Sequence, residues 1–170
     1  MSMHAKPLEA IPEMTAKIAR ASFPKGTLAM MLRDALNGVY TDEIFEDLYP
    51  RRGRAGVPPW RLAIVMVLQT IEGLSDLQAA EMVKGRLDWK YALSLPLDDR
   101  GFDQSILTDF RQRLIDQQAH ELVLLPILRI CIERGWIQEK GKQRLDSTYV
   151  LSSARRLNSL ESVGETPRAA

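Results

Sequence analysis

The stretch PPWRLAIVMVLQTIEGLSDLQAAEMVKG, residues 58–85, decides the fold of this chain. After Trp60 it is apolar on nearly every side, as expected of a helix that other helices surround. Pro58 and Pro59 are suited to a helix start, because the first turn leaves backbone N–H groups without helical partners. Residues 60–72 are therefore predicted to form the central core helix.

The second half of the stretch adds another helix after a short turn. Gly73 breaks the first helix, and Ser75 followed by Gln78 forms a capping box that starts the next one, which Gly85 ends. A helix, a glycine-containing turn and a second helix are the outline of a helix-turn-helix motif. The stretch thus predicts a helical bundle with a helix-turn-helix-like portion.

Helical periodicity continues on both sides of this stretch. After Thr27, a suitable N-cap, apolar residues recur at three- and four-residue steps. These residues are Leu28, Met31, Leu32 and Leu36. Further short helices are expected at residues 41–49, 87–95, 103–117 and 120–134. The last segment contains Pro126 and is predicted to be either one kinked helix or two short ones.

Strand-forming residues occur only near the end, in QRLDSTYVLSS at residues 143–153. A single strand leaves its backbone hydrogen-bonding groups unpaired, so the chain looks unfinished at this point. The predicted organisation is a weakly structured segment at residues 1–26, a helical domain at 27–138 and a truncated second domain at 139–170.

The composition is that of a globular protein of one domain's length, with 170 residues, of which 45% are hydrophobic and 26% charged. A net charge of +1 gives no overall attraction for an anionic partner, so any basic site must be local. One cysteine, Cys131, and two distant histidines, His4 and His120, exclude an internal disulfide and a Cys/His metal cluster. No secretion signal opens the chain and no apolar run approaches the roughly 20 residues that cross a bilayer, so a cytoplasmic protein without membrane contact is expected.

One local basic site is RRGRAGVPPWR, residues 51–61, which contains four arginines and no acid. The arginines are Arg51, Arg52, Arg54 and Arg61. Guanidinium groups bind phosphate in a bidentate manner, so this loop is a candidate for contacts to a DNA backbone. A solvated, charged loop is the alternative.

Two of the predicted helices could read base edges in a major groove. Residues 75–84 offer only Gln78 and Lys84, whereas residues 103–117 offer five side chains with hydrogen-bonding groups. The five side chains are those of Gln104, Ser105, Thr108, Arg111 and Gln112. The second helix is therefore preferred as the one that reads bases.

Three stretches carry a family resemblance. They are GLSDLQAAEMVKGRLDWKYALSLPLDD (73–99), FDQSILTDFRQRL (102–114) and QRLDSTYVLSSARRLNSLESVGET (143–166). Together they resemble the N-terminal region of bacterial insertion-sequence transposases with an Asp-Asp-Glu catalytic core, a region called the InsH-type transposase N-terminal domain. The resemblance covers most of the chain from residue 53 onward.

The resemblance implies a catalytic role for one residue. Asp146 matches the first of three carboxylates that hold Mg²⁺, on the first strand of a ribonuclease-H-like core. The counterparts of the other two carboxylates would lie beyond Ala170, so residues 139–170 are expected to be the start of an incomplete catalytic core. Since a single exposed carboxylate holds Mg²⁺ poorly against water, neither stable Mg²⁺ binding nor strand cleavage is expected of this chain alone.

These observations predict the DNA-binding part of an insertion-sequence transposase, which recognises double-stranded DNA at the terminal inverted repeats of the element. No small-molecule substrate is expected. An alternative is a truncated helical interaction module, or regulatory relic, that binds full-length transposase or nothing at all. The protein partners expected besides DNA are full-length transposase or further copies of the chain in a homo-oligomer. A third hypothesis, an independent metal nuclease, needs at least one more acid that converges on Asp146.

Overall fold

The computed structural model of the protein describes residues 9–36, 40–50 and 56–134. All of these residues belong to one compact unit, Met1–Ile137. In chain order its elements are α1 (Glu13–Ser22), α2 (Leu28–Ala35), the 3-10 helix η1 (Asp42–Leu48), α3 (Pro59–Glu72), α4 (Asp76–Gly85), α5 (Leu87–Ala92), α6 (Ser105–Asp116) and α7 (Glu121–Glu133). The predicted mainly helical bundle is confirmed, and the described residues contain no strand. The segment predicted as a strand, residues 143–153, lies outside them.

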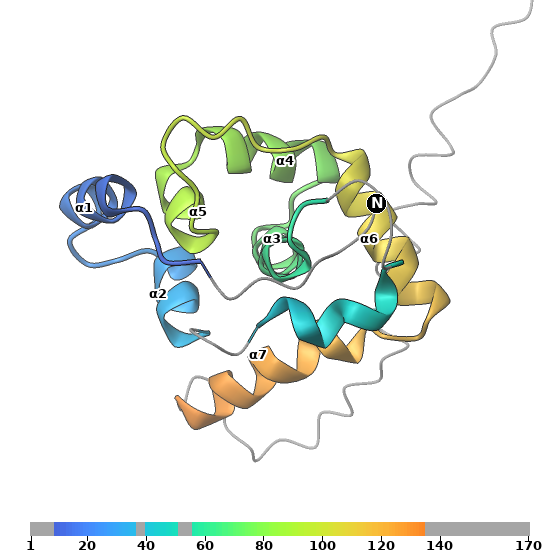
Figure 1. The fold of residues 1–170 in the computed structure, drawn as a ribbon. Coiled ribbons are helices and arrows are strands. Elements are labelled where there is room, and N and C mark those ends of the chain that lie inside the picture. The colour runs from blue at the N-terminus through green and yellow to red at the C-terminus, as the bar shows by residue number, and fades with distance from the viewer. Residues whose placement is uncertain (1–8, 37–39, 51–55, 135–170) are drawn as a thin grey trace, which may run out of the picture. The chain divides into compact units, whose positions relative to one another are not determined.

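Helix α3 forms the centre of the bundle, and the other helices lie around it (Figure 1). It begins at Pro59, as the sequence predicts, and ends before Gly73, which adopts a left-handed conformation with φ of 66°. Glycine adopts this conformation without the steric penalty that a Cβ atom brings. Trp60 and Leu68, near the two ends of α3, are both fully buried, so the helix is enclosed along most of its length.

The core around α3 contains buried apolar residues from α2, η1, α4, α5, α6 and α7. The largest side chains buried there are Trp60, Trp89, Tyr40, Phe45 and Phe110. Phe45 of η1 meets Phe110 of α6 edge to face, with 5.8 Å between ring centroids, a favoured aromatic geometry. The predicted helix around residues 41–49 is thus present as a 3-10 helix, whose aromatic ring helps to seat α6.

The junction between α3 and α4 has the predicted capping box. Ser75 Oγ accepts from Gln78 N at 3.3 Å, and Gln78 Oε1 accepts from Ser75 N at 2.8 Å. The two helix axes are bent by 111° at this junction. No single helix of the described residues is long and apolar enough to span a membrane; α3 and α4 meet that requirement only together, across the bend.

The N-terminal segment differs from the prediction of weak structure. Helix α1 lies within residues 1–26 and packs against α5. Its inward face consists of small residues: Thr15 and Ala19 are both 0% exposed, and Thr15 Oγ1 donates to the carbonyl of Leu95 at 2.9 Å. The large apolar residues of the helix, Met14 and Ile18, are instead exposed, so the apolar residues visible in the sequence do not mark its buried face.

The structure adds detail to the predictions for two other helices, α2 and α7. Thr27 caps α2 as expected, with its side chain accepting from Met30 N at 3.3 Å. Of the predicted apolar residues of α2, Leu32 and Leu36 are buried, whereas Leu28 and Met31 are each 44% exposed. Between the two forms left open for residues 120–134, the structure has one helix, α7, with Pro126 inside it.

Candidate nucleic-acid interface

Helix α6 exposes four of the five side chains predicted to read bases. We call them the α6 polar face, and they are Gln104, directly before the helix, with Ser105, Thr108 and Gln112. The opposite side of α6 buries Leu107, Phe110 and Leu114, each at most 2% exposed. Because these three residues fix the rotation of the helix, the polar face is turned to solvent.

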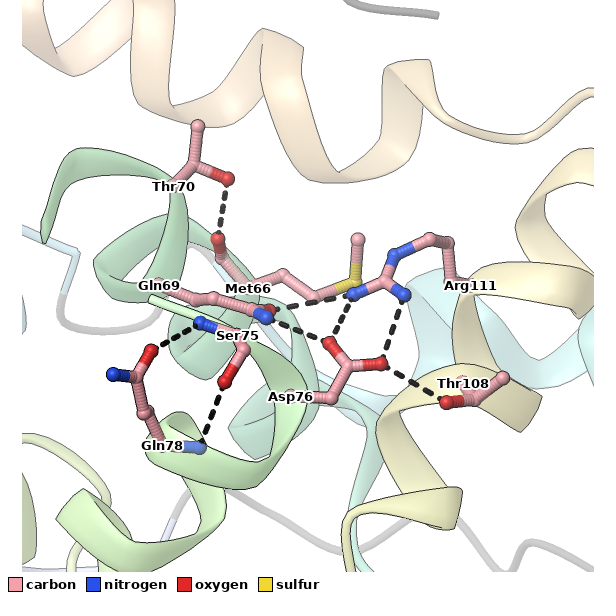
Figure 2. Close-up of polar contacts among 8 residues, drawn as sticks. All are labelled: Met66, Gln69, Thr70, Ser75, Asp76, Gln78, Thr108 and Arg111. Atoms are coloured by element: carbon pink, nitrogen blue, oxygen red, sulfur yellow. Dashed lines mark hydrogen bonds and ion pairs between the residues drawn. The ribbon is translucent and has the colours of Figure 1, made fainter. Parts of the chain in front are cut away.

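The fifth predicted side chain, Arg111, points toward α4. It donates to Asp76 twice, from Nη2 to Oδ1 at 2.7 Å and from Nη1 to Oδ2 at 3.0 Å. Asp76 also accepts from Thr108 Oγ1 at 2.9 Å and from Gln69 Nε2 at 2.6 Å. Figure 2 shows the carboxylate of Asp76 between these three partners. This Asp76 cluster, Gln69, Asp76, Thr108 and Arg111, joins α3, α4 and α6.

The environment of Asp76 keeps its side chain ionised at neutral pH. Burial would raise the pKa of this carboxyl, but the hydrogen bonds from Arg111, Gln69 and Thr108 outweigh it and lower the pKa below its ordinary value of 3.8. Asp76 also lies in the first turn of α4, where the helix dipole favours negative charge. Arg111 is therefore paired with a permanent anion, so its positive charge is largely neutralised within the protein.

The charges that α6 does expose are negative. Asp109 and Asp116 are both exposed, whereas Arg111 and Arg113 are half-buried. Gln112 Nε2 donates to Asp116 Oδ1 at 2.7 Å across one helical turn. The α6 polar face thus presents amide and hydroxyl groups, which suit base edges, and no exposed cation that could bind phosphate.

Described residues on both sides of the basic loop lie against α6. Tyr49, before the loop, and Gly56 and Val57, after it, line one small cavity together with Asp109 and Arg113 of α6. The guanidinium of Arg113 lies 5.0 Å from the centroid of the Tyr49 ring, and its Nη1 donates to the carbonyl of Leu48 at 3.4 Å. Arg51, Arg52 and Arg54 themselves lie outside the described residues.

Arg61, the fourth predicted phosphate ligand, has internal partners. Its Nε donates to the carbonyl of Leu93 at 2.8 Å and its Nη2 to the carbonyl of Ser94 at 3.1 Å. It also forms an ion pair with Glu9 and lies over the ring of Trp60, 5.2 Å from the centroid. With its side chain only 14% exposed, Arg61 holds the end of α5 against the start of α3.

The predicted catalytic and metal-binding residue, Asp146, lies outside the described residues. Among the residues that are described, no group of three or more histidines, cysteines, aspartates and glutamates is arranged to hold a metal ion. The carboxylate of Asp76 in the candidate interface already accepts hydrogen bonds from Arg111 and from two neutral donors. The described part of the chain therefore does not fit Mg²⁺.

Two members of the Asp76 cluster were not predicted as site residues. In the sequence, Asp76 is an acidic residue in the first turn of a predicted helix, and Gln69 is a polar residue within a predicted apolar helix. Arg111 lies 35 positions after Asp76, so no helical spacing pairs them. The only signal available was the unusual presence of Gln69 in the core helix, since a buried polar side chain needs a partner.

The fold and the site together define a helical domain in which α6 exposes a polar face and, on another side, contacts the described residues that flank residues 51–55. The family model described as "Transposase domain (DUF772)" matches residues 18–113, which is more than half of the chain. The chain therefore belongs to this transposase domain family. The match runs from within α1 to within α6 and includes the whole Asp76 cluster. No curated protein and no solved structure matches the chain.

Proposed function

We propose that this chain is the DNA-binding region of an insertion-sequence transposase of the Asp-Asp-Glu type, and that it recognises the terminal inverted repeats of its element. The observation that carries the proposal is the family match, because it spans the helices that surround α3. A transposase must place its catalytic carboxylates at one particular phosphodiester, and a separate helical domain that recognises the element's end can do this.

The α3–α4 pair supports the proposal by its geometry. Its bend of 111° lies within the range of about 90–120° at which the two helices of a helix-turn-helix meet, and Gly73 lies in the turn between them, which supports the proposal of such a motif. Asp76 fixes α6 to this pair through Arg111 and Thr108. The three helices α3, α4 and α6 would therefore dock on DNA as one rigid body.

Within this unit, the α6 polar face is the proposed base-reading surface. Glutamine side chains bind adenine in a bidentate manner, and hydroxyl groups serve as donors or acceptors for several bases. Gln112 would exchange its exposed bond to Asp116 for a base edge, which costs little because water already reaches both groups. Asp109 and Asp116 would disfavour close phosphates on that side of the helix and so help to set its orientation.

The basic loop is the proposed source of phosphate contacts. Its described neighbours, Tyr49 and Val57, lie against α6, and Arg51, Arg52 and Arg54 between them are the arginines proposed to bind phosphate. A loop that grips the backbone beside a helix that reads bases is the usual division of labour in protein–DNA recognition.

The proposal is tested by fluorescence anisotropy with a duplex of the element's terminal inverted repeat and a scrambled duplex of equal length. With about four to six phosphate contacts, the logarithm of the binding constant should fall with the logarithm of salt concentration at a slope near −0.9 per contact. Joint replacement of Arg51, Arg52 and Arg54 by alanine should make this slope shallower. Affinity that is indifferent to salt, or equal for the two duplexes, would contradict the proposal.

A matched pair of glutamine variants tests the base-reading face. Gln112→Ala should reduce the preference for the inverted repeat by about 1–3 kcal/mol if its amide makes a bidentate base contact. Gln117→Ala is the control, because Gln117 is also exposed but caps the C-terminus of α6 outside the polar face. Leu77→Ala changes an exposed side chain of α4, the other helix that could read bases. A loss of preference for the inverted repeat in this variant, and not in Gln112→Ala, would favour α4 as the reading helix.

A further inference from the structure

Helix α7 carries two apolar faces, of which only one is used in the bundle. On the inner face Val123 and Ile130 are 8% and 5% exposed and belong to the core, and Tyr40 Oη donates to the carbonyl of Val123. On the outer face Leu125 and Ile132 are 51% and 42% exposed. Leu124 and Leu128 are half-buried on this side but are not among the residues packed against the core. The helix lies at the edge of the described bundle (Figure 1).

The outer residues form a continuous stripe along the helix. Glu121, Leu125, Leu128 and Ile132 are separated by four, three and four positions, which places them on one side of an α-helix, opposite Val123 and Ile130. A stripe with this spacing is the sequence pattern by which one helix packs along another. A helix that is apolar on both sides is normally covered on both sides.

We propose that α7 pairs in antiparallel fashion with α7 of a second copy of this chain. Leucines occupy the middle of the stripe, Glu121 lies at its N-terminal end, and Arg129 flanks it toward the C-terminal end. In an antiparallel pair centred between residues 125 and 128, Leu125 of one copy lies opposite Leu128 of the other, and Ile132 lies opposite the methylene groups of Glu121. Glu121 of each copy then comes within one turn of Arg129 of the other, so the two-fold axis repeats one ion pair.

This contact does not depend on the proposed DNA binding, but it would serve it. Two inverted repeats are related by a two-fold axis, and so are two copies joined through α7. A pair of 13-residue helices is only about 20 Å long and buries less surface than a permanent dimer interface. A reversible dimer with a dissociation constant in the micromolar range is therefore expected.

Sedimentation equilibrium of the full 170-residue chain, in reductant and without DNA, tests the contact. The average mass should rise from 19.3 kDa toward twice that value as concentration increases. Leu125→Ser combined with Ile132→Ser should weaken association at least about tenfold, whereas Ile71→Ser, which changes an equally exposed side chain on α3, should leave it unchanged. Circular dichroism checks that each variant is folded.

Charge reversal tests the antiparallel arrangement. Glu121→Arg and Arg129→Glu should each weaken self-association, because each places like charges opposite one another. Mixing the two single variants should restore a dimer, since every contact in the mixed pair joins opposite charges. A chain that stays monomeric at every concentration, or a dimer that the serine variants leave intact, would overturn the inference. Salt-dependent DNA binding by such a monomer would leave the proposed function standing.

Discussion

Arg111 of α6 donates two hydrogen bonds to Asp76 of α4, at 2.7 and 3.0 Å, and so joins the middle of one helix to the first turn of another. The pair is partly buried, with the side chain of Arg111 29% exposed and that of Asp76 22% exposed. The same carboxylate also accepts from Gln69 of α3. One acid therefore adds a polar connection between α6 and the α3–α4 pair to the apolar contacts that fix the rotation of the helix.

A double-mutant cycle measures the strength of this connection. Asp76→Ala and Arg111→Ala should each lower the free energy of unfolding by about 1–3 kcal/mol, because each leaves a partly buried charge without its partner. The double variant should lose less than the sum of the two. The exposed pair Glu81–Lys84 is the control, and its coupling should be about 0.5 kcal/mol or less. Equal coupling in both cycles would contradict a special role for the Asp76 cluster.

The lowered pKa of Asp76 predicts how this contribution varies with pH. A carboxyl whose pKa is lower in the folded state stabilises the protein above its unfolded pKa and loses that contribution as the pH falls through the folded value. Asp76→Asn should therefore be less stable than the parent protein at neutral pH. The difference should shrink as the pH falls below the ordinary pKa of 3.8. Urea titrations at several pH values measure the difference in the free energy of unfolding between the two proteins. A difference that stays constant from neutral pH to below pH 3.8 would contradict the lowered pKa of Asp76.

Gly101 determines how the chain enters α6. It has φ of +67°, and a Cβ atom there would lie 2.9 Å from Lys84 Cγ in α4. Gly101→Ala should therefore lower the free energy of unfolding by about 1–3 kcal/mol. Gly85→Ala is the matched control, because nothing lies within 4 Å of the added Cβ and Gly85 ends a helix. The control should be neutral or stabilising by up to about 1 kcal/mol in thermal unfolding. Similar losses in both variants would argue against the close approach of Gly101 to α4.

Replacement of Arg61 tests whether this residue has a structural role or binds a DNA phosphate. Arg61→Lys should lower the free energy of unfolding by about 1–2 kcal/mol, because lysine cannot reproduce the planar fork that reaches the carbonyls of Leu93 and Ser94. The salt dependence of DNA binding should stay the same. A normal melting temperature for Arg61→Ala, which removes the charge, combined with a slope that is shallower by about 0.9 would instead support the phosphate contact predicted from the sequence.

Much of the fold could be predicted because it depends on local signals. Pro59, Gly73 and the Ser75–Gln78 capping box mark helix ends through their own backbone chemistry, and each acts where it was expected. The missed helix α1 buries the small residues Thr15 and Ala19, whereas its large apolar residues, Met14 and Ile18, are exposed. Local chemistry therefore predicts where a helix ends better than which small residues it buries.

The candidate site could be predicted only in part, for a related reason. Four of the five α6 side chains proposed from the sequence to read bases are exposed, as that role requires. The direction of an arginine, in contrast, depends on partners that are distant in sequence: Arg111 finds Asp76, and Arg61 finds the carbonyls at the end of α5. A basic loop and a polar helix are visible in the sequence, but the neutralisation of individual cations is not.

The last prediction concerns Asp146 and Mg²⁺. Two-metal phosphoryl transfer needs several clustered carboxylates, because Mg²⁺ gives up its water reluctantly. By resemblance the 170 residues contain one of the three, Asp146, and the described residues contain no acidic cluster that could replace the others. We therefore expect the purified chain to bind the inverted repeat equally well with Mg²⁺ or with a chelator, and to leave supercoiled plasmid intact. Asp146→Ala should change neither result. Nicking that requires Mg²⁺ and disappears in Asp146→Ala would contradict this expectation, and would mean that further carboxylates converge on Asp146 in the assembled protein.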